Sequence, residues 1–467
     1  MASGTANRTK RQAFRYEHPM RPRTLLPLIA LLATAGCRPG GPARIEYVTI
    51  QSKNLPADQL RGNITEWSWN IAAKALKHLT PDFNREYPHV RVNVDMTGAR
   101  MEARVLLALA AGVGAPDVTQ FQISDAQRYI ATGKLLDLTP VAMKYRDRFP
   151  RKLWNNCVRD GRVFAIPWDM GPCAVYYKRD LFAKYDVDPA KIDTWDDYIA
   201  AGKTILAKSG GRTKMLTLGA NSIRQMYEML LQQTGGQVFD DDGRIVVDSP
   251  QSNEVLALIK RMRESGICSD VAQYSQEYMA GFNGESIASY PMAVWFAGTI
   301  RDTVKDFAGQ KASWGVFRLP AIHPGGSHVS NIGGSVLTIP AQCKQPEAAW
   351  RFIEYALCTV PGQVDQYKTM SLFPAYLPAL KDATFDEPDP FFEGQKVGRL
   401  FATDVEKIQA LNRTPSWSEA QNYLDQAFSQ WAATGMNSDG FFHAIEQKLH
   451  RRLGIPVGTP SAQVARQ

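Results

Sequence analysis

The stretch that decides the fold covers residues 160–182 and reads Asp160-Gly-Arg-Val-Phe-Ala-Ile-Pro-Trp-Asp-Met-Gly-Pro-Cys-Ala-Val-Tyr-Tyr-Lys-Arg-Asp-Leu-Phe182. A glycine turn opens it, and Pro167 halts its first apolar run. Because proline has no N–H to donate to a central ladder, we expect a strand end, or a crossing between two structural units, at Pro167. Trp168 and Asp169 follow as a polar tip, and such a tip is well placed to face a cleft.

On the N-terminal side of this stretch, strand and helix patterns alternate. Alternating apolar residues predict strands at 64–69 and 90–96, and apolar residues at helical spacing predict helices at 72–87 and 99–111. A further strand is expected at 116–122. This order predicts an α/β fold with a parallel sheet and right-handed crossovers. A chain of 467 residues leaves room for two or three domains.

On the C-terminal side, a capping box at 194–197 predicts the start of a helix. The apolar run 292–296 predicts a buried strand, and a short strand is also expected near the N-terminus at 45–50. Residues 331–340 predict a glycine turn that leads into another buried strand. A helix is expected at 346–355, because its first residue is a proline and prolines are favoured at that position.

Four of these segments resemble one known family. They are Ala110-Ala-Gly-Val-Gly-Ala-Pro-Asp-Val118, Gly161-Arg-Val-Phe-Ala-Ile-Pro167, Tyr176-Tyr-Lys-Arg-Asp-Leu-Phe182, and the Gly-Gly turn at 333–334 with the strand and Pro346-Glu-Ala-Ala-Trp-Arg-Phe352 that follow it. In combination, they resemble the extracellular solute-binding proteins of bacterial ABC importers, in the sugar-binding family 1 that includes maltose-binding-like lipoproteins. The resemblance covers most of the chain.

The resemblance implies a two-lobed periplasmic-binding-protein fold, type II-like, with hinge-linked lobes that each hold a central, mostly parallel sheet. The implied parts are a signal peptide with lipobox at 1–37, a tether and N-terminal extension at 38–62, lobe 1 at 63–168 and 326–370, lobe 2 at 169–325 and 371–453, and a flexible tail at 454–467. The chain is expected to act as a monomer.

The N-terminus carries an export pattern. Arg21 and Arg23 precede the apolar run 25–35, which is too short for a bilayer span of roughly 20 residues but suits a secretory signal. The segment Thr34-Ala-Gly-Cys37 resembles a bacterial lipobox, which implies cleavage before Cys37 and lipidation of its thiol. We therefore expect an exported protein, lipid-anchored at the outer face of the cytoplasmic membrane, in the periplasm or at the cell surface. The alternative is an ordinary signal peptide with an incidental cysteine.

Charge excludes one class of partner. The formal net charge is +8, but residues 1–37 hold six Lys or Arg and one acid, so the remainder is near +3. No basic run with interleaved aromatic residues occurs, so nucleic acid is not an expected partner. Five cysteines follow Cys37, and the sequence leaves their pairing open.

The residues expected to bind a ligand lie at strand ends and near the lobe crossings, where ligands of open parallel sheets collect. They are Trp69, Thr97, Asp125, Trp168, Asp169, Trp295, Phe296, Gly333, Gly334, Phe373 and Tyr376. Sugars suit this set, because their C–H faces pack on aromatic rings and their hydroxyls pair with carboxylates and amides.

Structural roles compete with several of these assignments. Trp67 and Trp69 alternate along a strand, so only one of them should face the cleft, and Trp69 is the choice nearer the strand end. Asp125 is also a plausible helix cap for 126–131, and both roles stay open. Trp295 and Phe296 both suit a core. The glycines 333 and 334 also suit positive φ or close backbone approach.

Signals for catalysis or metal binding are weak. The seven histidines are dispersed, and neither a His-Glu-x-x-His motif nor a Gly-x-Ser-x-Gly elbow is present. His323 and His328 flank a glycine-rich loop, and three aspartates at 240–242 form a turn, but solvated surface is the better interpretation of both. We therefore expect no enzyme, no metal and no cofactor.

The function expected from sequence is capture of a carbohydrate, such as an oligosaccharide or glycoside, between the two lobes and its delivery to an ABC permease. Two alternatives remain. A lipid-anchored glycoside hydrolase would need two carboxyl groups set roughly 5–10 Å apart. A cleft crowded with arginines would instead favour an anionic solute such as glycerol phosphate.

Overall fold

Two strands, β6 and β11, make most of the strand pairs in the main sheet of this fold. The computed structural model describes residues 45–98, 101–306 and 313–460. The expected signal peptide and Cys37 lie outside these residues. Among the described residues, the strands are β1 (Gly62–Ser68), β2 (Val90–Met96), β3 (Val118–Gln122), β4 (Val158–Arg159), β5 (Arg162–Val163), β6 (Ala165–Lys178), β7 (Leu216–Thr217), β8 (Cys268–Ser269), β9 (Ser289–Ala293), β10 (Trp314–Arg318) and β11 (Asn331–Thr338).

The α-helices alternate with these strands in the first third of the chain and dominate its end. They are α1 (Asn70–Glu86), α2 (Met101–Ala111), α3 (Ala126–Ile130), α4 (Thr139–Ala142), α5 (Arg151–Asn155), α6 (Arg179–Lys184), α7 (Trp195–Lys208), α8 (Ile223–Gln233), α9 (Pro250–Glu264), α10 (Gln276–Asn283), α11 (Phe296–Asp306), α12 (Pro346–Leu357), α13 (Val360–Met370), α14 (Val397–Ala402), α15 (Trp417–Ala433) and α16 (Phe441–Leu453). The expected capping box is present, with Thr194 and Asp197 as its two partners.

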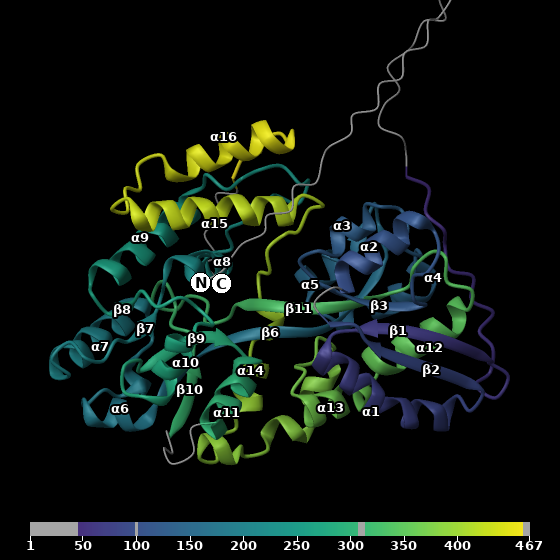
Figure 1. Cartoon of the computed structure of the whole chain (residues 1–467), viewed down its shortest axis with the longest axis horizontal. Coiled ribbons are helices and arrows are strands. Elements are labelled where there is room, and N and C mark those ends of the chain that lie inside the picture. Colours follow the sequence, from purple (N-terminus) through teal and green to yellow (C-terminus); the bar gives the residue numbers. More distant parts are fainter. Residues whose placement is uncertain (1–44, 99–100, 307–312, 461–467) are drawn as a thin grey trace, which may run out of the picture. The chain divides into compact units, whose positions relative to one another are not determined.

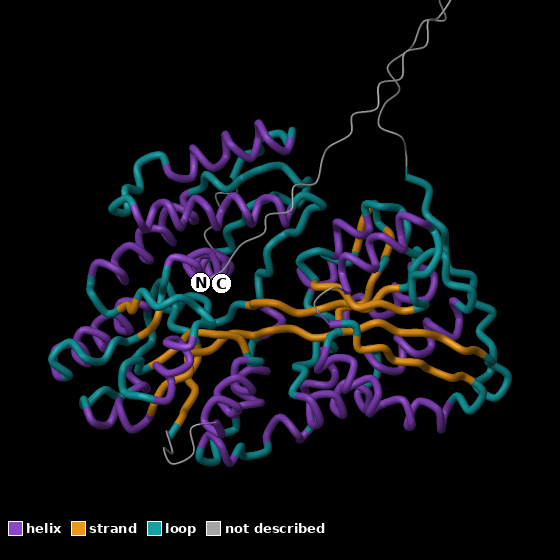
Figure 2. Tube along the Cα trace, viewed as in Figure 1, coloured by secondary structure: helices purple, strands orange, loops and turns teal. Residues whose placement is uncertain are grey.

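The main sheet is mixed. Its strand order is β10-β6-β11-β3-β1-β2, with β9 also paired to β6. The β1–β2 and β1–β3 pairs are parallel, as the strand–helix alternation predicts. The pairs that β6 and β11 make are antiparallel, so the sheet is not mostly parallel throughout. Figure 2 shows the strands of this main sheet as a band that runs through the structure, and the pairs β4–β5 and β7–β8 form two further small sheets.

Strand β6 passes through Pro167, so the prediction of a strand end there is wrong. The pairing of β6 with β11 shifts register between Ser335, which faces Asp169, and Val336, which faces Pro167. This irregularity leaves Trp168 as the extra residue on β6, and a bulge is one of the places where a strand tolerates proline. The first half of β6 then pairs with β11, and its second half pairs with β9 and β10.

Helices pack on the two ends of this long strand pair. Helices α8, α9, α15 and α16 gather at one end, whereas α1, α12 and β2 lie at the other (Figure 1). The buried apolar residues form three clusters: one around α7–α9, α15 and α16, one around α1, α12 and α13, and one between them around β6, β9 and α11.

Two of the lobe boundaries expected from sequence can be located on elements of the structure. The boundary 168/169 falls inside β6, and the boundary 370/371 falls at the end of α13, where Ser371 adopts a left-handed conformation. The expected strand at 45–50 is absent, and Thr49 forms only an isolated bridge with Asp137. The described part of the tail is not free, because Ile245 pairs with Val457.

All five cysteines after Cys37 lie in the described part of the chain, and each is a free thiol. Burial raises the pKa of the Cys268 thiol to about 12, which keeps it protonated and unreactive at neutral pH. Within residues 45–98, 101–306 and 313–460, no helix has both the length and the apolar character that a bilayer crossing requires.

Candidate functional site

The candidate site forms where the carboxyl ends of β1 and β3 meet the bulged region of β11 and β6. Trp69 follows β1, and Asp125 follows β3 three residues after its last residue. Strand β11 lies beside β3, with Ser335 opposite Gln122, and β6 lies beside β11, with Asp169 opposite Ser335. The topology therefore brings four segments that are far apart in sequence to one edge.

A hydrogen-bonded chain of side chains connects these segments. The backbone N–H of Trp69 donates to Oε1 of Gln120 over 3.1 Å, and Nε2 of Gln120 donates to the Ser335 hydroxyl over 2.9 Å. The Ser335 hydroxyl donates in turn to Oδ1 of Asp169. Because Gln120 and Ser335 are buried, their polar atoms have few other partners, and the chain fixes Trp69 and Asp169 relative to each other.

Asp169 has one oxygen engaged. Its Oδ1 also accepts from the Ser335 backbone N–H over 2.9 Å, so both hydrogen bonds from Ser335 reach the same oxygen. Burial raises the pKa of this carboxyl above its usual value, although both Ser335 hydrogen bonds oppose the shift. A ligand hydroxyl that donates to Oδ2 would complete the coordination of this group.

The two glycines of β11 have different constraints. Gly333 is exposed with φ of 83°, and its surroundings would admit a side chain. Gly334 has φ of 103°, and a Cβ added there would lie 2.7 Å from the Asp169 carbonyl oxygen. Gly334 is thus required for the close approach of β6 and β11, as the structural interpretation of the sequence anticipated. Gly333 leaves backbone uncovered at the site.

The Trp295 indole lies next to the exposed backbone of Gly333. It follows β9 in a turn rather than closing the strand, and its ring is half-buried. Its indole N–H donates to the Ile332 carbonyl over 3.3 Å, and its Nε1 lies 3.6 Å from where a Cβ on Gly333 would be. Trp295 and the half-buried Trp69 are therefore the two indole rings with exposed surface at this edge.

Asp125 does not cap α3 with its side chain. Instead, Oδ2 accepts from the Ser124 hydroxyl over 3.1 Å, and Oδ1 accepts from the Ser418 hydroxyl of α15 over 2.5 Å. The side chain is half-buried, so part of it stays accessible. This carboxylate meets a residue 293 positions away and lies at the junction of two distant segments.

A charged cluster borders Asp125 on the side of α8 and α15. Arg224 pairs with Glu228 over 2.5 Å and with Asp425 over 2.7 Å, and Arg413 lies 3.7 Å from Glu228. Burial alone would raise the pKa of Glu228, but the two guanidinium groups outweigh it and hold that pKa below its usual value. The Arg413 guanidinium also stacks on Trp417, 3.7 Å from the ring centroid. The arginines here are therefore balanced by carboxylates.

Four of the expected ligand residues are buried among core side chains in this structure. Trp168 is fully buried, and its indole N–H donates to Gln366 over 2.7 Å. Phe296 begins α11 and packs on Tyr176 and other rings, as Phe373 packs on a second group of rings. Tyr376 is buried beside Phe149. Apolar surroundings supply the physical reason in each case, because these rings fill the space between the helices and the sheet.

Trp67 and Thr97 lie on either side of Trp69 in the β1–β2 region. Trp67 is buried under the guanidinium of Arg104, 3.8 Å from its ring centroid, which agrees with the choice of Trp69 as the exposed partner. Thr97 is half-buried, and its backbone N–H donates to the Ser68 carbonyl over 3.2 Å. This bond places Thr97 next to Trp69 along the same edge.

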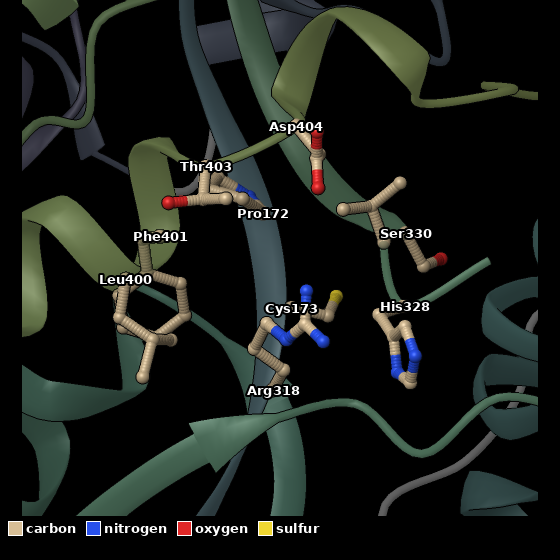
Figure 3. A pocket seen from close by; sticks show the side chains of 10 residues that line it. Pro172, Cys173, Arg318, His328, Ser330, Leu400, Phe401, Thr403 and Asp404 are labelled. Carbon is tan, nitrogen blue, oxygen red and sulfur yellow. The ribbon is translucent and has the colours of Figure 1, made fainter. Parts of the chain in front are cut away.

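A small cavity is lined by none of the residues discussed for this site (Figure 3). Its volume of about 10 Å³ is room for about one water molecule and none for a sugar. Its lining residues are Pro172, Cys173, Arg318, His328, Val329, Ser330, Leu400, Phe401, Thr403 and Asp404. His328 is held there by the Leu319 carbonyl, whereas His323 pairs with Glu254, so the two histidines do not converge on one site.

Three polar residues of the site were missed in the sequence analysis: Gln120, Ser335 and Ser418. Gln120 gave no distinct signal, because the strand Val118–Gln122 reads Val-Thr-Gln-Phe-Gln and holds two other polar residues. Ser335 directly follows the glycine pair. Ser418 gave no signal, since it reads as an ordinary polar residue of a helix.

Chemically, this edge offers two partly exposed indole rings, two carboxylates with free capacity and exposed backbone at Gly333. Rings and acceptors in this combination suit a neutral, hydroxyl-rich solute, whose C–H faces contact the rings and whose hydroxyls donate to the carboxylates.

Comparison with known proteins places this geometry in context. The family model described as bacterial extracellular solute-binding protein matches residues 79–391 of the chain. An arabinooligosaccharide-binding protein of Halalkalibacterium halodurans is 26% identical over 320 residues, which cover 67% of this chain and 71% of that protein. A lactose-binding protein of Rhizobium radiobacter is 25% identical over 367 residues, which cover 75% and 84%.

Solved structures share the fold. The sugar-binding protein MalE from Xanthomonas citri superimposes with a TM-score of 0.71 at 19% identity, covering 84% of this chain and 97% of that one. A binding protein from B. animalis subsp. lactis Bl-04, solved with beta-1,6-galactobiose, gives a TM-score of 0.66 at 24% identity, covering 85% and 99%. The expected two-lobed α/β fold of periplasmic binding proteins is thereby confirmed.

Proposed function

The chain belongs to the bacterial extracellular solute-binding proteins, and from this we propose that it captures a carbohydrate and delivers it to an ABC transporter permease. The observation that carries the proposal is the pairing of Trp69 and Asp169 through Gln120 and Ser335, which presents a ring and a carboxylate at one edge in fixed positions. Relatives named for arabinooligosaccharides and lactose support the same solute class.

The two indoles supply the stacking surfaces. Trp69 and Trp295 are each half-buried, so their edges are anchored while part of each ring remains available. A pyranose or furanose ring laid on an indole buries its C–H face and loses little hydrogen bonding. The indole N–H of Trp295 donates to the Ile332 carbonyl and restrains the orientation of that ring. The backbone N–H of Trp69 donates to Gln120 and fixes the backbone that carries the other ring.

The carboxylates supply specificity for hydroxyl groups. In the proposed complex, Asp169 would accept a ligand hydroxyl at Oδ2, and Asp125 would share Oδ1 between the Ser418 hydroxyl and a sugar hydroxyl. Thr97 and the Gly333 backbone add further polar atoms along the same edge. A site with a few fixed polar groups around aromatic surfaces is typical of small-molecule binding between lobes.

An uncharged solute is favoured over an anionic one. Arg224 and Arg413 lie in the charged cluster beside Asp125, and both face Glu228, with Asp425 as a further partner of Arg224. Their positive charge is already compensated, so a phosphate group would find no free guanidinium pair among them. Glycerol phosphate is therefore not our proposal.

Delivery and location complete the proposal. Proteins of this family are extracellular, so the chain is exported. Lipidation at Cys37 would hold it at the outer face of the cytoplasmic membrane, where a ligand-bound, closed form docks on the permease. The relatives are binding proteins rather than enzymes, and the solute would leave chemically unchanged.

A thermal-shift screen of the purified chain against a panel of mono- and oligosaccharides tests this function. A ligand that binds only the folded chain raises its midpoint by mass action. Arabino-oligosaccharides, lactose and galactobiose should be included, with spermidine, ferric iron and a short peptide as other solute classes. A shift with a saccharide supports the proposal, and a shift only with one of the other classes overturns it.

A further inference from the structure

Three possible metal ligands meet on the helical end of the structure, in a region that the proposed function does not use. Asp248 lies just before α9, and His443 and Glu446 lie three residues apart on α16. Residues at this spacing occupy one face of a helix, one turn apart. The two helix residues therefore point toward the same segment, and that segment provides Asp248.

The separations of the donor atoms fit a shared cation. The three donor atoms all lie within 4.8 Å of one another, and Nδ1 of His443 is 3.4 Å from Oδ2 of Asp248. A distance of 3.4 Å is longer than an ordinary N–H···O hydrogen bond. In a tetrahedral zinc site with bonds of about 2.0–2.1 Å, neighbouring donor atoms lie about 3.4 Å apart. A small movement of the third side chain would complete such a geometry.

Glu446 is the buried member of the cluster. Only 7% of the residue is exposed, and its carboxylate lies within 4.8 Å of the donor atoms of Asp248 and His443. A buried carboxylate beside another carboxylate is costly unless a cation or a proton compensates it.

We propose that Asp248, His443 and Glu446 bind a divalent transition-metal ion that joins α16 to the segment before α9. Backbone hydrogen bonds already connect the segment before α9 with the segment after α16. The Ile245 N–H donates to the Pro456 carbonyl over 3.0 Å, and the Gly458 N–H donates to the Ile245 carbonyl over 2.8 Å. The ion would thus reinforce a junction between the C-terminal helix and residues 245–248.

The ligand types select the class of metal. One imidazole and two carboxylates suit Zn²⁺, and they also accept Co²⁺ and Ni²⁺. Ca²⁺ and Mg²⁺ prefer six or more oxygen ligands, so they should bind this set weakly. Three protein ligands leave a tetrahedral position for water, which the exposed side of His443 makes accessible.

Zn²⁺ titration of the chelator-treated full chain tests the proposal. We expect one Zn²⁺ per chain with micromolar or tighter affinity, a rise in the unfolding midpoint, and no comparable rise with Mg²⁺. Co²⁺ should give visible absorption bands of a four- or five-coordinate site. The variants His443→Ala and Glu446→Gln should each weaken Zn²⁺ at least tenfold and remove the Co²⁺ bands.

His323→Ala is the matched control, because His323 is also exposed and pairs with a single carboxylate, Glu254, over 2.6 Å. This variant should keep the full Zn²⁺ affinity. If a variant on α16 fails to fold, Asp248→Asn serves as the second test of the site, since Asp248 lies outside α16. The proposal is overturned if the native chain binds no Zn²⁺ at 100 µM, or if His443→Ala and Asp248→Asn bind it as tightly as the native chain.

Discussion

The hydroxyl of Ser418 donates a 2.5 Å hydrogen bond to Oδ1 of Asp125, and this contact joins the start of α15 to the end of β3. The two residues belong to opposite lobes in the division proposed from sequence. Lys152 makes a second contact of this kind, 3.1 Å from Asp241. Together they mark the face across which the proposed lobes would close on a ligand.

Ser418→Ala should weaken sugar binding about fivefold, because the closed arrangement loses a hydrogen bond worth about 1 kcal/mol. The stability of the unliganded chain should change little, since Ser418 is only half-buried. Isothermal titration with the sugar found in the screen measures the effect. Ser416→Ala is the control, because the Ser416 side chain makes no capping bond at the same helix start. Equal affinities for both variants would show that the contact does not assist closure.

Trp69→Ala and Trp168→Ala should separate binding from stability. Trp69 is half-buried at the site, so its loss should weaken sugar binding at least about tenfold and cost about 1–2 kcal/mol of unfolding free energy. Trp168 is fully buried and bonded to Gln366, so its loss should cost about 3–5 kcal/mol. Denaturant unfolding and titration of each variant check both values. The opposite pattern would make Trp69 a core residue.

Gly333→Ala and Gly334→Ala should differ although both glycines have positive φ. Gly333→Ala should lower the unfolding free energy by about 1–2 kcal/mol, because an alanine at this exposed position only has to adopt a left-handed conformation. At 334 the new Cβ would also lie 2.7 Å from the Asp169 carbonyl, so the total loss should reach about 3 kcal/mol or more. Chemical denaturation measures both losses. Equal losses would mean that β6 moves away from β11 without cost.

Glu66→Gln should change how stability depends on pH. Burial raises the pKa of Glu66 to about 8, against a usual value of 4.5, although Ser68 donates to its carboxylate. The folded chain therefore keeps this proton as pH rises from 4.5, whereas the unfolded chain loses it, and the folded state loses stability until pH 8. Gln does not titrate, so the variant should gain about 2 kcal/mol or more relative to the native chain between pH 4 and pH 9.

Urea unfolding of both proteins across this pH range gives the difference directly. A constant difference between the two proteins at all pH values would contradict the raised pKa of Glu66. A difference that grows at acid pH, instead of at alkaline pH, would assign the pH dependence to another group.

Local patterns predicted much of the fold. The strand expected at 90–96 coincides with β2, and the helices expected at 72–87 and 346–355 correspond to α1 and α12 with ends shifted by one or two residues. These elements have clear alternation or helical spacing, and their ends carry proline or a cap, so neighbouring residues determine them.

Long-range contacts explain what the sequence did not reveal. From sequence, Pro167 predicts a strand end. In the structure the strand continues, because the pairing of β6 with β11 shifts register there and accommodates the proline. Trp168 reads as a cleft residue, but Gln366, nearly 200 residues later, binds its indole N–H. Trp69, Asp125 and Asp169 were predicted at this edge. Gln120 and Ser335, which connect Trp69 with Asp169, became recognisable only through pairing across β3, β11 and β6.

The most direct test of the central claim is a tryptophan-fluorescence titration with the sugar from the screen, followed by mass analysis of the recovered saccharide. We predict saturation at one saccharide per chain, loss of most of the signal change in Trp69→Ala, and recovery of the saccharide at its original mass. Cleavage products from the native chain, or the absence of saturation with every saccharide tested, would contradict the account.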